Sequence, residues 1–319
     1  MKKPTALYYR ILKYQPQNLA LLVRYFDLVE LENPTHDTAG ILAKTDALFA
    51  PLGFSVDAAK IEACPRLKVI LSNTTGIPHI DALAAADRNV TICALNDEQV
   101  FLDGITPTAE HTIGLMIAAW RSIPAAHAET CRGVWDRRPW GAPAMMSRMR
   151  LGIVGYGRLG KKVAKIARAI GMQVNYFDPA VAGGLPDLLQ LASQSDILSL
   201  HAVGNEQTRH LVSRVVLEAL PRGAMVVNTA RGEVLDTNAL IDLLESGHLY
   251  CAALDTVDGE YGVNFSEHFA NSRLARYART HNNLLLTPHI GGSTIDAWGE
   301  TESRVVQKAI HALGLKIVC

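Results

Sequence analysis

The sequence has few cysteines, no excess charge of either sign and no long apolar run, and each absence excludes a class of protein. Its cysteines are odd in number and never form a C-x-x-C pair: Cys64, Cys93, Cys131, Cys251 and Cys319. Neither a disulfide framework nor a zinc or other metal site is indicated, and a reducing cytoplasm is the expected location. The 31 basic and 31 acidic residues cancel, which disfavours nucleic acid and anionic membrane as partners. We expect no signal peptide and no membrane helix, which needs about 18 apolar residues.

The remaining features are those of an ordered protein large enough for two hydrophobic cores, because 319 residues exceed the usual size of one. Short apolar runs alternate with segments of helical periodicity, which is typical of β-α units around parallel sheets. The expected strands of the first hundred residues are 6–9, 26–31, 47–51, 68–72 and 90–93. A denser β-α array spans residues 151–286, and helices are expected at 108–123 and 294–313. The sequence therefore predicts an α/β protein with two domains.

A glycine-rich turn opens the second array. Residues 151–160 read Leu-Gly-Ile-Val-Gly-Tyr-Gly-Arg-Leu-Gly, an apolar strand followed by G-x-G-x-x-G at Gly155, Gly157 and Gly160. A segment of helical periodicity follows, and then a second strand that ends at Asp178, which completes the unit of a dinucleotide-binding fold. The glycines permit a tight turn, close approach of a pyrophosphate and close packing of helix on strand. A glycine-rich turn without a ligand is the structural alternative.

Asp178 indicates which dinucleotide binds. At the end of the second strand its carboxylate can accept hydrogen bonds from both ribose hydroxyls and would repel a 2′-phosphate. We therefore expect NAD rather than NADP. Arg158, inside the fingerprint, either contacts the cofactor or points to solvent.

Three further segments each follow an apolar strand, so that Arg231, Glu260 and His289 should lie near the carboxyl edge of one parallel sheet, where ligands of such sheets bind. The segments are 228–236, 254–260 and 287–294. Taken singly, each residue has a structural alternative: Arg231 as an arginine that caps a helix, Glu260 as a glutamate on a loop and His289 as a histidine beside a turn. Their joint occurrence beyond a nucleotide fingerprint favours a catalytic site.

With these segments in place, the chain resembles the D-isomer-specific 2-hydroxyacid dehydrogenase family, and the likeness extends through Cys64–Ile70, Thr75–Asp81 and Thr108–Thr112. It implies hydride transfer between NAD and a small 2-keto or 2-hydroxy acid. It implies two open parallel-sheet domains, Rossmann-like or flavodoxin-like, with the NAD-binding domain (residues 101–288) inserted into a catalytic domain (residues 1–100 plus 289–319). A homodimer formed mainly by the nucleotide domains is also implied.

The resemblance assigns roles to single residues. It makes His289 the acid/base, Glu260 its partner and Arg231 the clamp on the substrate's oxygens. Imidazole titrates near neutrality, a neighbouring carboxylate favours its charged form, and a planar guanidinium meets two oxygens at once. Backbone N–H groups around Thr75 and Gly76 become the cradle of the substrate carboxylate. Further cofactor contacts are assigned to Thr108, Arg158, Leu159, Thr229, Ala230, Asp255 and Gly292.

The chain also departs from the family pattern. Where D-V-F-x-x-E-P is usual, it has Asp255-Thr-Val-Asp-Gly-Glu260-Tyr261, which leaves the aim of Glu260 open, and the usual H-x-P is His201-Ala-Val203. Arginines at spacing three, Arg273, Arg276 and Arg279, form either a solvated helix face or a binding patch. Trp135 and Trp140 are candidates for interface packing or a wall of the partner's pocket.

Two other functions remain open. One is a redox-sensing or corepressor-like protein that binds NAD(H) with little turnover. The other is a formate-dehydrogenase-like enzyme, for which an ionisable residue at Glu260 is not expected. Residues 49–55 and 72–77 contain no cation, so the expected substrate is a small, non-phosphorylated acid such as glyoxylate, hydroxypyruvate or a longer aliphatic homologue.

Overall fold

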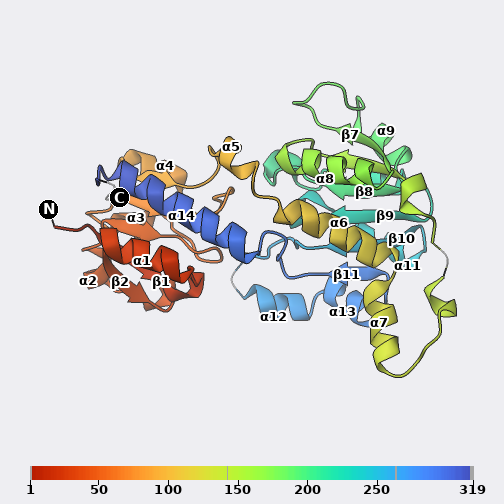
Figure 1. Cartoon of the computed structure of the whole chain (residues 1–319), viewed down its shortest axis with the longest axis horizontal. Coiled ribbons are helices and arrows are strands. Elements are labelled where there is room, and N and C mark those ends of the chain that lie inside the picture. The colour runs from red at the N-terminus through yellow and green to blue at the C-terminus, as the bar shows by residue number, and fades with distance from the viewer. Residues whose placement is uncertain (1, 142, 263, 317–319) are drawn as a thin grey trace. The chain divides into compact units, whose positions relative to one another are not determined.

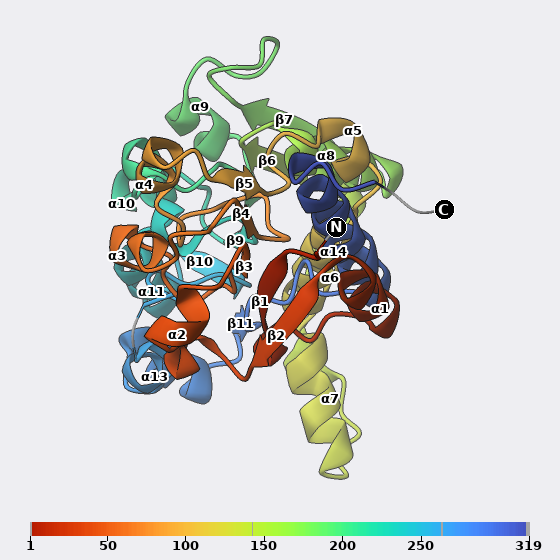
Figure 2. The same ribbon diagram turned by 90° about the vertical axis from the view of Figure 1, so that its left-hand side faces the viewer.

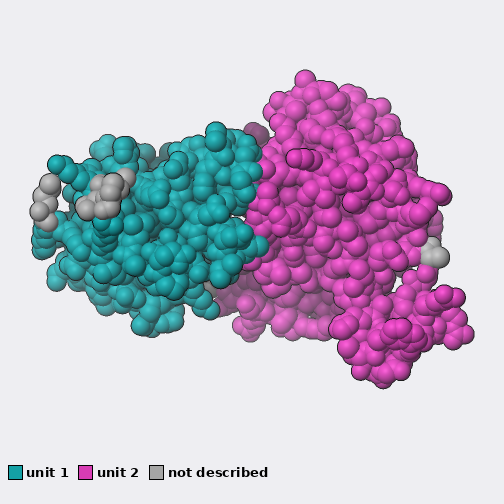
Figure 3. Space-filling view, viewed as in Figure 1, with its two compact units in different colours: residues 1–105, 294–319 teal, residues 106–293 magenta. Residues whose placement is uncertain are grey.

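The computed structural model describes residues 2–141, 143–262 and 264–316, which form two compact units (Figure 3). Unit 1 comprises Met1–Ile105 and Thr294–Cys319, and unit 2 comprises Thr106–Ser293. Both junctions lie slightly C-terminal to the expected ones. At the first junction Leu102 is buried in the core of unit 1, and at the second the residues after Pro288 are tied to Asp255 of unit 2.

Unit 1 is built on a five-stranded parallel sheet of order β2-β1-β3-β4-β5. Figure 1 shows the whole chain, and all five strands of this sheet are labelled in Figure 2. Its strands are β1 (Thr5–Tyr9), β2 (Asp27–Leu31), β3 (Ala47–Phe49), β4 (Val69–Leu71) and β5 (Thr91–Cys93). Its helices are α1 (Pro16–Tyr25), α2 (Ala39–Leu42), α3 (Ala58–Glu62), α4 (Ala82–Asp87), α5 (Gln99–Leu102) and α14 (Ile295–Ala312), with 3-10 turns at Arg10–Leu12 and Pro34–His36. Each strand lies within or one residue beyond its expected range.

The C-terminal helix α14 packs against α1 in unit 1, although nearly 200 residues separate the two parts of this unit in the sequence. Figure 2 shows α1 and α14 on one side of the sheet, and α2, α3 and α4 on the other. The buried carboxylate of Glu302 accepts hydrogen bonds at 2.8 Å from the Gln15 backbone N–H and from Asn18 Nδ2. Burial raises the pKa of this carboxyl. The tail is thus joined to the first helix by apolar packing and by a satisfied polar contact.

Unit 2 is built on a six-stranded parallel sheet of order β11-β10-β9-β8-β6-β7. The strands are β6 (Arg150–Val154), β7 (Gln173–Phe177), β8 (Ile197–Leu200), β9 (Ala224–Asn228), β10 (Leu249–Leu254) and β11 (Leu284–Leu286). Because β6 pairs with β7 on one side and β8 on the other, the chain changes winding direction at β6. Such a switch point is where open α/β sheets bind ligands.

Helices cover both faces of this sheet, so successive strand residues enter different cores. On β10, Cys251 and Ala253 face the core with α6 and α8, while Ala252 and Leu254 face the core with α9, α10, α11 and α13. The helices are α6 (Pro107–Trp120), α7 (Ile123–Cys131), α8 (Arg158–Ala169), α9 (Leu188–Ser193), α10 (Arg214–Glu218), α11 (Thr237–Glu245), α12 (Phe265–Ala270) and α13 (Arg273–Thr280). Short 3-10 turns lie at Arg138–Trp140, Met146–Arg148, Glu206–Thr208 and Gly232–Val234.

These two parallel sheets confirm the predicted α/β fold. Helix α7 was not predicted: Ser122 adopts a left-handed φ of 51°, which ends α6 and starts a second helix. In the described part of the chain, no helix is both long and apolar enough to cross a membrane.

Candidate active site

The turn between β6 and α8 holds the three glycines of the fingerprint, and their surroundings differ. Gly155 has a φ of +90°, and a Cβ there would meet the backbone nitrogen of Ala202 at 2.6 Å. A Cβ on Gly160 would lie 2.2 Å from the carbonyl oxygen of Gly155. A Cβ on Gly157 would meet nothing within 4 Å. Gly155 and Gly160 therefore close the turn, and Gly157 leaves space in which a phosphate can approach the backbone.

The start of helix α8 fits an anion. Its N-cap is Gly157, which has no side chain with which to bond the first-turn N–H groups. Those groups and the positive end of the helix dipole favour negative charge. Arg158 and Leu159 are the first two helical residues, and both are half-buried rather than fully solvated. The residues of this turn thus fit the pyrophosphate of a dinucleotide.

Asp178 lies directly beside the turn. The Tyr156 N–H donates to Asp178 Oδ2 at 2.7 Å, and the Ala180 N–H donates to Oδ1 at 2.8 Å. A carboxylate oxygen can accept more than one hydrogen bond, so both oxygens keep capacity for further donors. The structure thus places the carboxylate where the fingerprint predicts a ribose contact.

Two tyrosines beside Asp178 were not predicted. The rings of Tyr156 and Tyr176 stack with centroids 3.7 Å apart and an interplanar angle of 8°. Arg168 Nη1 reaches the Tyr156 hydroxyl at 3.3 Å, and the Tyr176 hydroxyl donates to the carbonyl of Ala182 at 2.6 Å. In the sequence, only the positions of the two tyrosines set them apart. Tyr156 lies between the first two glycines of the motif, and Tyr176 is the last residue but one of β7.

Asp255 organises the loop that carries His289. It follows β10, and only 2% of its surface is exposed. Its carboxylate accepts hydrogen bonds from Thr287 Oγ1 at 2.5 Å, from the Ile290 N–H at 2.9 Å and from the Gly291 N–H at 2.8 Å. Its backbone carbonyl accepts the His289 N–H at 2.8 Å. One buried residue therefore holds the loop on both sides of His289.

Helix α6 brings more of the predicted residues to this edge of unit 2. His111 Nε2 lies 3.1 Å from Thr287 Oγ1 and 3.3 Å from Asp255 Oδ1. A Cβ on Gly291 would be 3.5 Å from Thr108 Cγ2, and one on Gly292 would be 3.7 Å from Thr108 Oγ1. The predicted cofactor residues Thr108, Asp255 and Gly292 are thus neighbours, and His111 is a member of the cluster that the sequence reasoning missed.

Thr229 and Ala230 follow β9 and are buried. Thr229 Oγ1 lies 2.7 Å from Thr112 Oγ1 on α6, and the Ala230 N–H donates to Asn228 Oδ1 at 3.0 Å. These contacts fix the start of the loop that leads to Arg231.

His289 and Glu260 are brought together despite the altered loop. His289 Nδ1 lies 2.9 Å from Glu260 Oε1, although the two atoms are not aligned for a hydrogen bond. The Tyr261 hydroxyl lies 3.0 Å from the same nitrogen, with hydrogen-bond geometry. His289 has a left-handed φ of 53°, a strained conformation that the Asp255 contacts hold in place. Two consecutive residues therefore meet one ring nitrogen.

Arg231 stands at the start of the 3-10 turn Gly232–Val234, and its Nη1 donates to the Ala230 carbonyl at 2.7 Å. Its Cγ would be 2.7 Å from a Cβ on Gly204. A Cβ on Gly232 would lie 2.0 Å from the backbone nitrogen of Asp258. The Arg231 loop and the loop leading to Glu260 are thus in direct backbone contact.

Thr75 and Gly76 belong to unit 1 and follow β4. The Gly76 carbonyl accepts a hydrogen bond from Thr74 Oγ1 at 2.6 Å, and Thr74 Oγ1 lies 2.8 Å from Ser72 Oγ. His79 Nε2 lies 3.3 Å from Ser72 Oγ. The predicted cradle is therefore a loop braced by its own hydroxyl groups.

The remaining residues singled out in the sequence lie away from these contacts. Arg273 forms ion pairs with Asp242 at 2.6 Å and Glu245 at 2.8 Å. Arg276 and Arg279 donate to the carbonyls of Asn271 and Ala270. Trp135 is 92% exposed, and Trp140 is half-buried.

The four cysteines that the structure describes supply no reactive group to the site. Burial raises the pKa of the Cys64 and Cys93 thiols to about 11 and that of Cys251 to about 12, which makes them inert at neutral pH. Cys131 is exposed on α7, and Cys319 lies outside the described residues.

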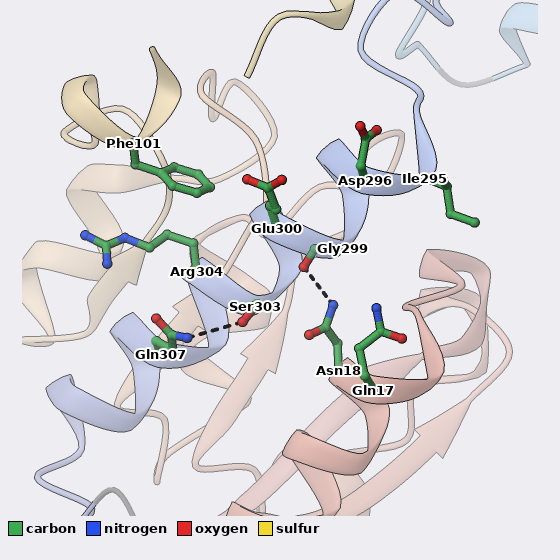
Figure 4. A pocket seen from close by; sticks show the side chains of 10 residues that line it. All are labelled: Gln17, Asn18, Phe101, Ile295, Asp296, Gly299, Glu300, Ser303, Arg304 and Gln307. Carbon is green, nitrogen blue, oxygen red and sulfur yellow. Dashed lines mark hydrogen bonds between the residues drawn. The ribbon is translucent and has the colours of Figure 1, made fainter. Parts of the chain in front are cut away.

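A separate open pocket lies in unit 1, along α1 and α14 (Figure 4). Its side chains are mostly amides, hydroxyls and charged groups: Gln17, Asn18, Phe101, Ile295, Asp296, Gly299, Glu300, Ser303, Arg304 and Gln307. Asn18 Nδ2 crosses it to the Gly299 carbonyl at 2.9 Å, and Arg304 is paired with Glu98 at 2.5 Å. These contacts join helices, and the pocket includes none of the predicted site residues.

Comparison with known proteins shows which family and fold this chain is similar to. A family model described as the D-isomer specific 2-hydroxyacid dehydrogenase, NAD binding domain, matches residues 113–291, more than half of the chain. The hydroxypyruvate reductase of Thermotoga maritima is 32% identical over 280 residues, which cover 86% of this chain and 87% of that protein. The D-3-phosphoglycerate dehydrogenase of Methanocaldococcus jannaschii is 32% identical over 261 residues, 79% of this chain. The chain spans about half the length of that relative, 47%.

Among solved structures, the TT0316 protein from Thermus thermophilus superposes with a TM-score of 0.83. It is 26% identical in sequence, and the match covers 98% of both chains.

Proposed function

This chain belongs to the D-isomer specific 2-hydroxyacid dehydrogenase family of NAD(P)-dependent oxidoreductases, and we propose that it interconverts a small, non-phosphorylated 2-keto acid and its D-2-hydroxy acid. The observation that carries the proposal is the distance of 2.9 Å between Glu260 Oε1 and His289 Nδ1. His289 stands on a loop that buried Asp255 anchors through hydrogen bonds from Ile290 and Gly291. Bound NADH would supply the hydride. The chain's own residues hold the cofactor and the acid, and they deliver a proton.

His289 is the proposed proton donor in reduction. Its two contacts fall on Nδ1, so Nε2 on the other side of the ring is the nitrogen that delivers the proton to the substrate oxygen. Glu260 stabilises the protonated ring by its negative charge. Arg231 is the proposed partner of the substrate's carboxylate and carbonyl oxygens, because its planar guanidinium can bind two oxygens. Thr75 and Gly76 are proposed to offer backbone N–H groups to the carboxylate.

The proposed cofactor is NAD rather than NADP. Asp178 presents a carboxylate beside the glycine turn, with capacity left on both oxygens for ribose hydroxyls. A 2′-phosphate would meet this negative charge. We expect kcat/KM for NADH to exceed that for NADPH at least about tenfold, which corresponds to about 1.4 kcal/mol. Equal values, or a preference for NADPH, would remove Asp178 from this role.

The proposed substrate carries no phosphate. A dianion needs cations or several N–H donors around it, and neither Phe49–Ser55 nor Ser72–Ile77 contains lysine or arginine. Glyoxylate, hydroxypyruvate and longer aliphatic 2-keto acids fit this description. A clear kcat/KM preference for 3-phosphohydroxypyruvate over hydroxypyruvate would contradict it.

The direct test is NADH oxidation with a panel of 2-keto acids. Turnover of at least one small acid supports the proposal. Tight NADH binding with no turnover across the panel would instead support a redox-sensing or corepressor-like protein.

We also propose the homodimer and the cytoplasmic location that the sequence analysis predicts. Exposed Trp135 is then a candidate for the dimer interface. Light scattering at micromolar concentration, with Trp135→Ser as the comparison, tests the assembly.

A further inference from the structure

The hydroxyl of Tyr261 makes a hydrogen bond with the His289 ring, and the proposed mechanism assigns this tyrosine no role of its own. It lies 3.0 Å from Nδ1. Glu260 Oε1 is closer to the same nitrogen, at 2.9 Å, but is not aligned for a hydrogen bond with it. Within residues 2–141, 143–262 and 264–316, this oxygen has no hydrogen-bond partner. The charge and the directed hydrogen bond at Nδ1 therefore come from different residues.

The surroundings of Tyr261 keep its hydroxyl protonated. Burial, followed by the negative charge of Glu260, raises the pKa of Tyr261 to about 12. A neutral hydroxyl can accept the N–H of a protonated imidazole through a lone pair. The tyrosine ring is held close to the histidine, with centroids 5.9 Å apart and planes tilted by 47°. A proline, the residue usual at this position in the family pattern, offers no such group.

We propose that Tyr261 is a positioning residue for His289. The Tyr261 hydroxyl oxygen accepts the Nδ1–H of His289 and fixes the plane of the imidazole ring, while Glu260 supplies the stabilising charge. This inference rests on the proposed role of His289. It explains how Glu260 can serve the histidine without being aligned with it. The hydroxyl sets the direction of Nδ1–H, and hence the direction in which Nε2 points.

The other charged and titratable groups around this pair come from three elements. They are Asp255 after β10, His111 on α6, and Arg231 with Glu233 in the turn after β9. Replacing Tyr261 by phenylalanine changes none of these charges and keeps the aromatic ring. A change in the titration of His289 in that variant therefore reports the lost hydrogen bond.

The test is a nitrogen-15 NMR titration of the histidine rings in the full chain, with His289 assigned by the signal that disappears in His289→Asn. In Tyr261→Phe we expect the titration midpoint of His289 to move to lower pH by about half a unit to one unit, because one hydrogen bond to the protonated ring is lost. We expect kcat for the best 2-keto acid to fall about threefold to tenfold. KM for NADH should be unchanged.

Tyr277→Phe is the matched control. Tyr277 is a buried tyrosine in helix α13 of unit 2, and its hydroxyl donates to Asn283 Oδ1 at 2.9 Å. Its loss should leave the His289 midpoint unmoved. A midpoint that stays in place in Tyr261→Phe, or that moves to higher pH, overturns the proposal.

The titration needs no substrate, so it separates this inference from the proposed function. A protein that reduces no 2-keto acid but shows the shift would reject the proposed function and retain the Tyr261 contact. A protein that turns over normally and shows no shift would do the reverse.

Discussion

The glycine turn at 155–160 and the His289 loop at 287–292 belong to the same sheet edge but are built by opposite means. The turn is shaped by absent side chains: Cβ atoms on Gly155 and Gly160 would collide with backbone. The loop is shaped by a present one, because the Asp255 carboxylate accepts hydrogen bonds from Ile290 and Gly291. Adding atoms to the glycines should therefore disrupt the turn, and removing polar atoms from Asp255 should disrupt the His289 loop.

This difference matches what each region has to do. A phosphate is large and charged, and it needs backbone N–H groups with space around them. A proton donor needs one ring nitrogen held in one direction, and buried hydrogen bonds supply that orientation.

The largest expected effect is on the proton donor itself. His289→Asn removes the group that protonates the substrate oxygen, so kcat for reduction should fall about a hundredfold or more. NADH binding, measured by fluorescence titration, should be retained. A kcat within a few-fold of that of the unchanged protein would exclude His289 as the acid.

The next test adds one methyl group to the turn at two positions. Gly155→Ala should lower the free energy of unfolding by about 1 to 3 kcal/mol, because its φ of +90° and the approach of Ala202 both penalise a Cβ. Gly157→Ala should leave thermal stability nearly unchanged and weaken NADH binding at least about tenfold. A Gly157→Ala variant that melts as early as Gly155→Ala, or that binds NADH as tightly as the unchanged protein, would contradict the distinct roles of the glycines.

Removing a charge from the loop anchor should cost stability and turnover together. Asp255→Asn turns one accepting oxygen into a donor facing a backbone N–H, which costs about 1 to 3 kcal/mol of folding free energy. Thermal unfolding and steady-state kinetics measure both effects. Asp187→Asn is the control, because Asp187 is exposed and caps helix α9 by accepting the Gln190 N–H at 2.8 Å. If the Asp255 variant loses no more stability than the control, the loop is held by something else.

The smallest expected effect concerns His201, between the two regions. Burial lowers the pKa of His201 to about 4, while the unfolded value is 6.5. The folded protein keeps this ring neutral, so the unfolded chain binds the extra proton between pH 6.5 and 4, and stability falls as pH drops through that window. His201→Gln should flatten this part of the curve of unfolding free energy against pH. A slope unchanged by the substitution would mean that other groups cause the acid loss.

Elements with local signals were predictable from the sequence. Strands β7 and β11 lie where the sequence predicts strands, directly before Asp178 and directly before the segment 287–294, because their apolar runs are bounded by clear turn signals. The glycine turn was also predictable from local sequence, because each glycine has its own fixed place in a short motif. Helix α7 was missed because its start depends on Ser122 adopting a left-handed conformation, which residue type does not indicate.

The side-chain network of the His289 loop was less predictable because it joins residues far apart in the sequence. Asp255 meets Ile290 and Gly291 across 35 and 36 positions, and Tyr261 meets His289 across 28. No local spacing encodes such contacts. The sequence showed that the usual proline at position 261 was absent, but only the fold shows what the tyrosine contacts.

The most direct test of the central claim, that Glu260 supports His289 as a proton donor, is the pH profile of kcat/KM for NADH-dependent reduction in Glu260→Gln. Reduction proceeds where the histidine is protonated and fades above that range. Loss of the carboxylate removes a charge that favours the protonated ring, so the alkaline limb should move to lower pH. Affinity for NADH should not change. An alkaline limb that stays in place would show that Glu260 and His289 are neighbours without being coupled.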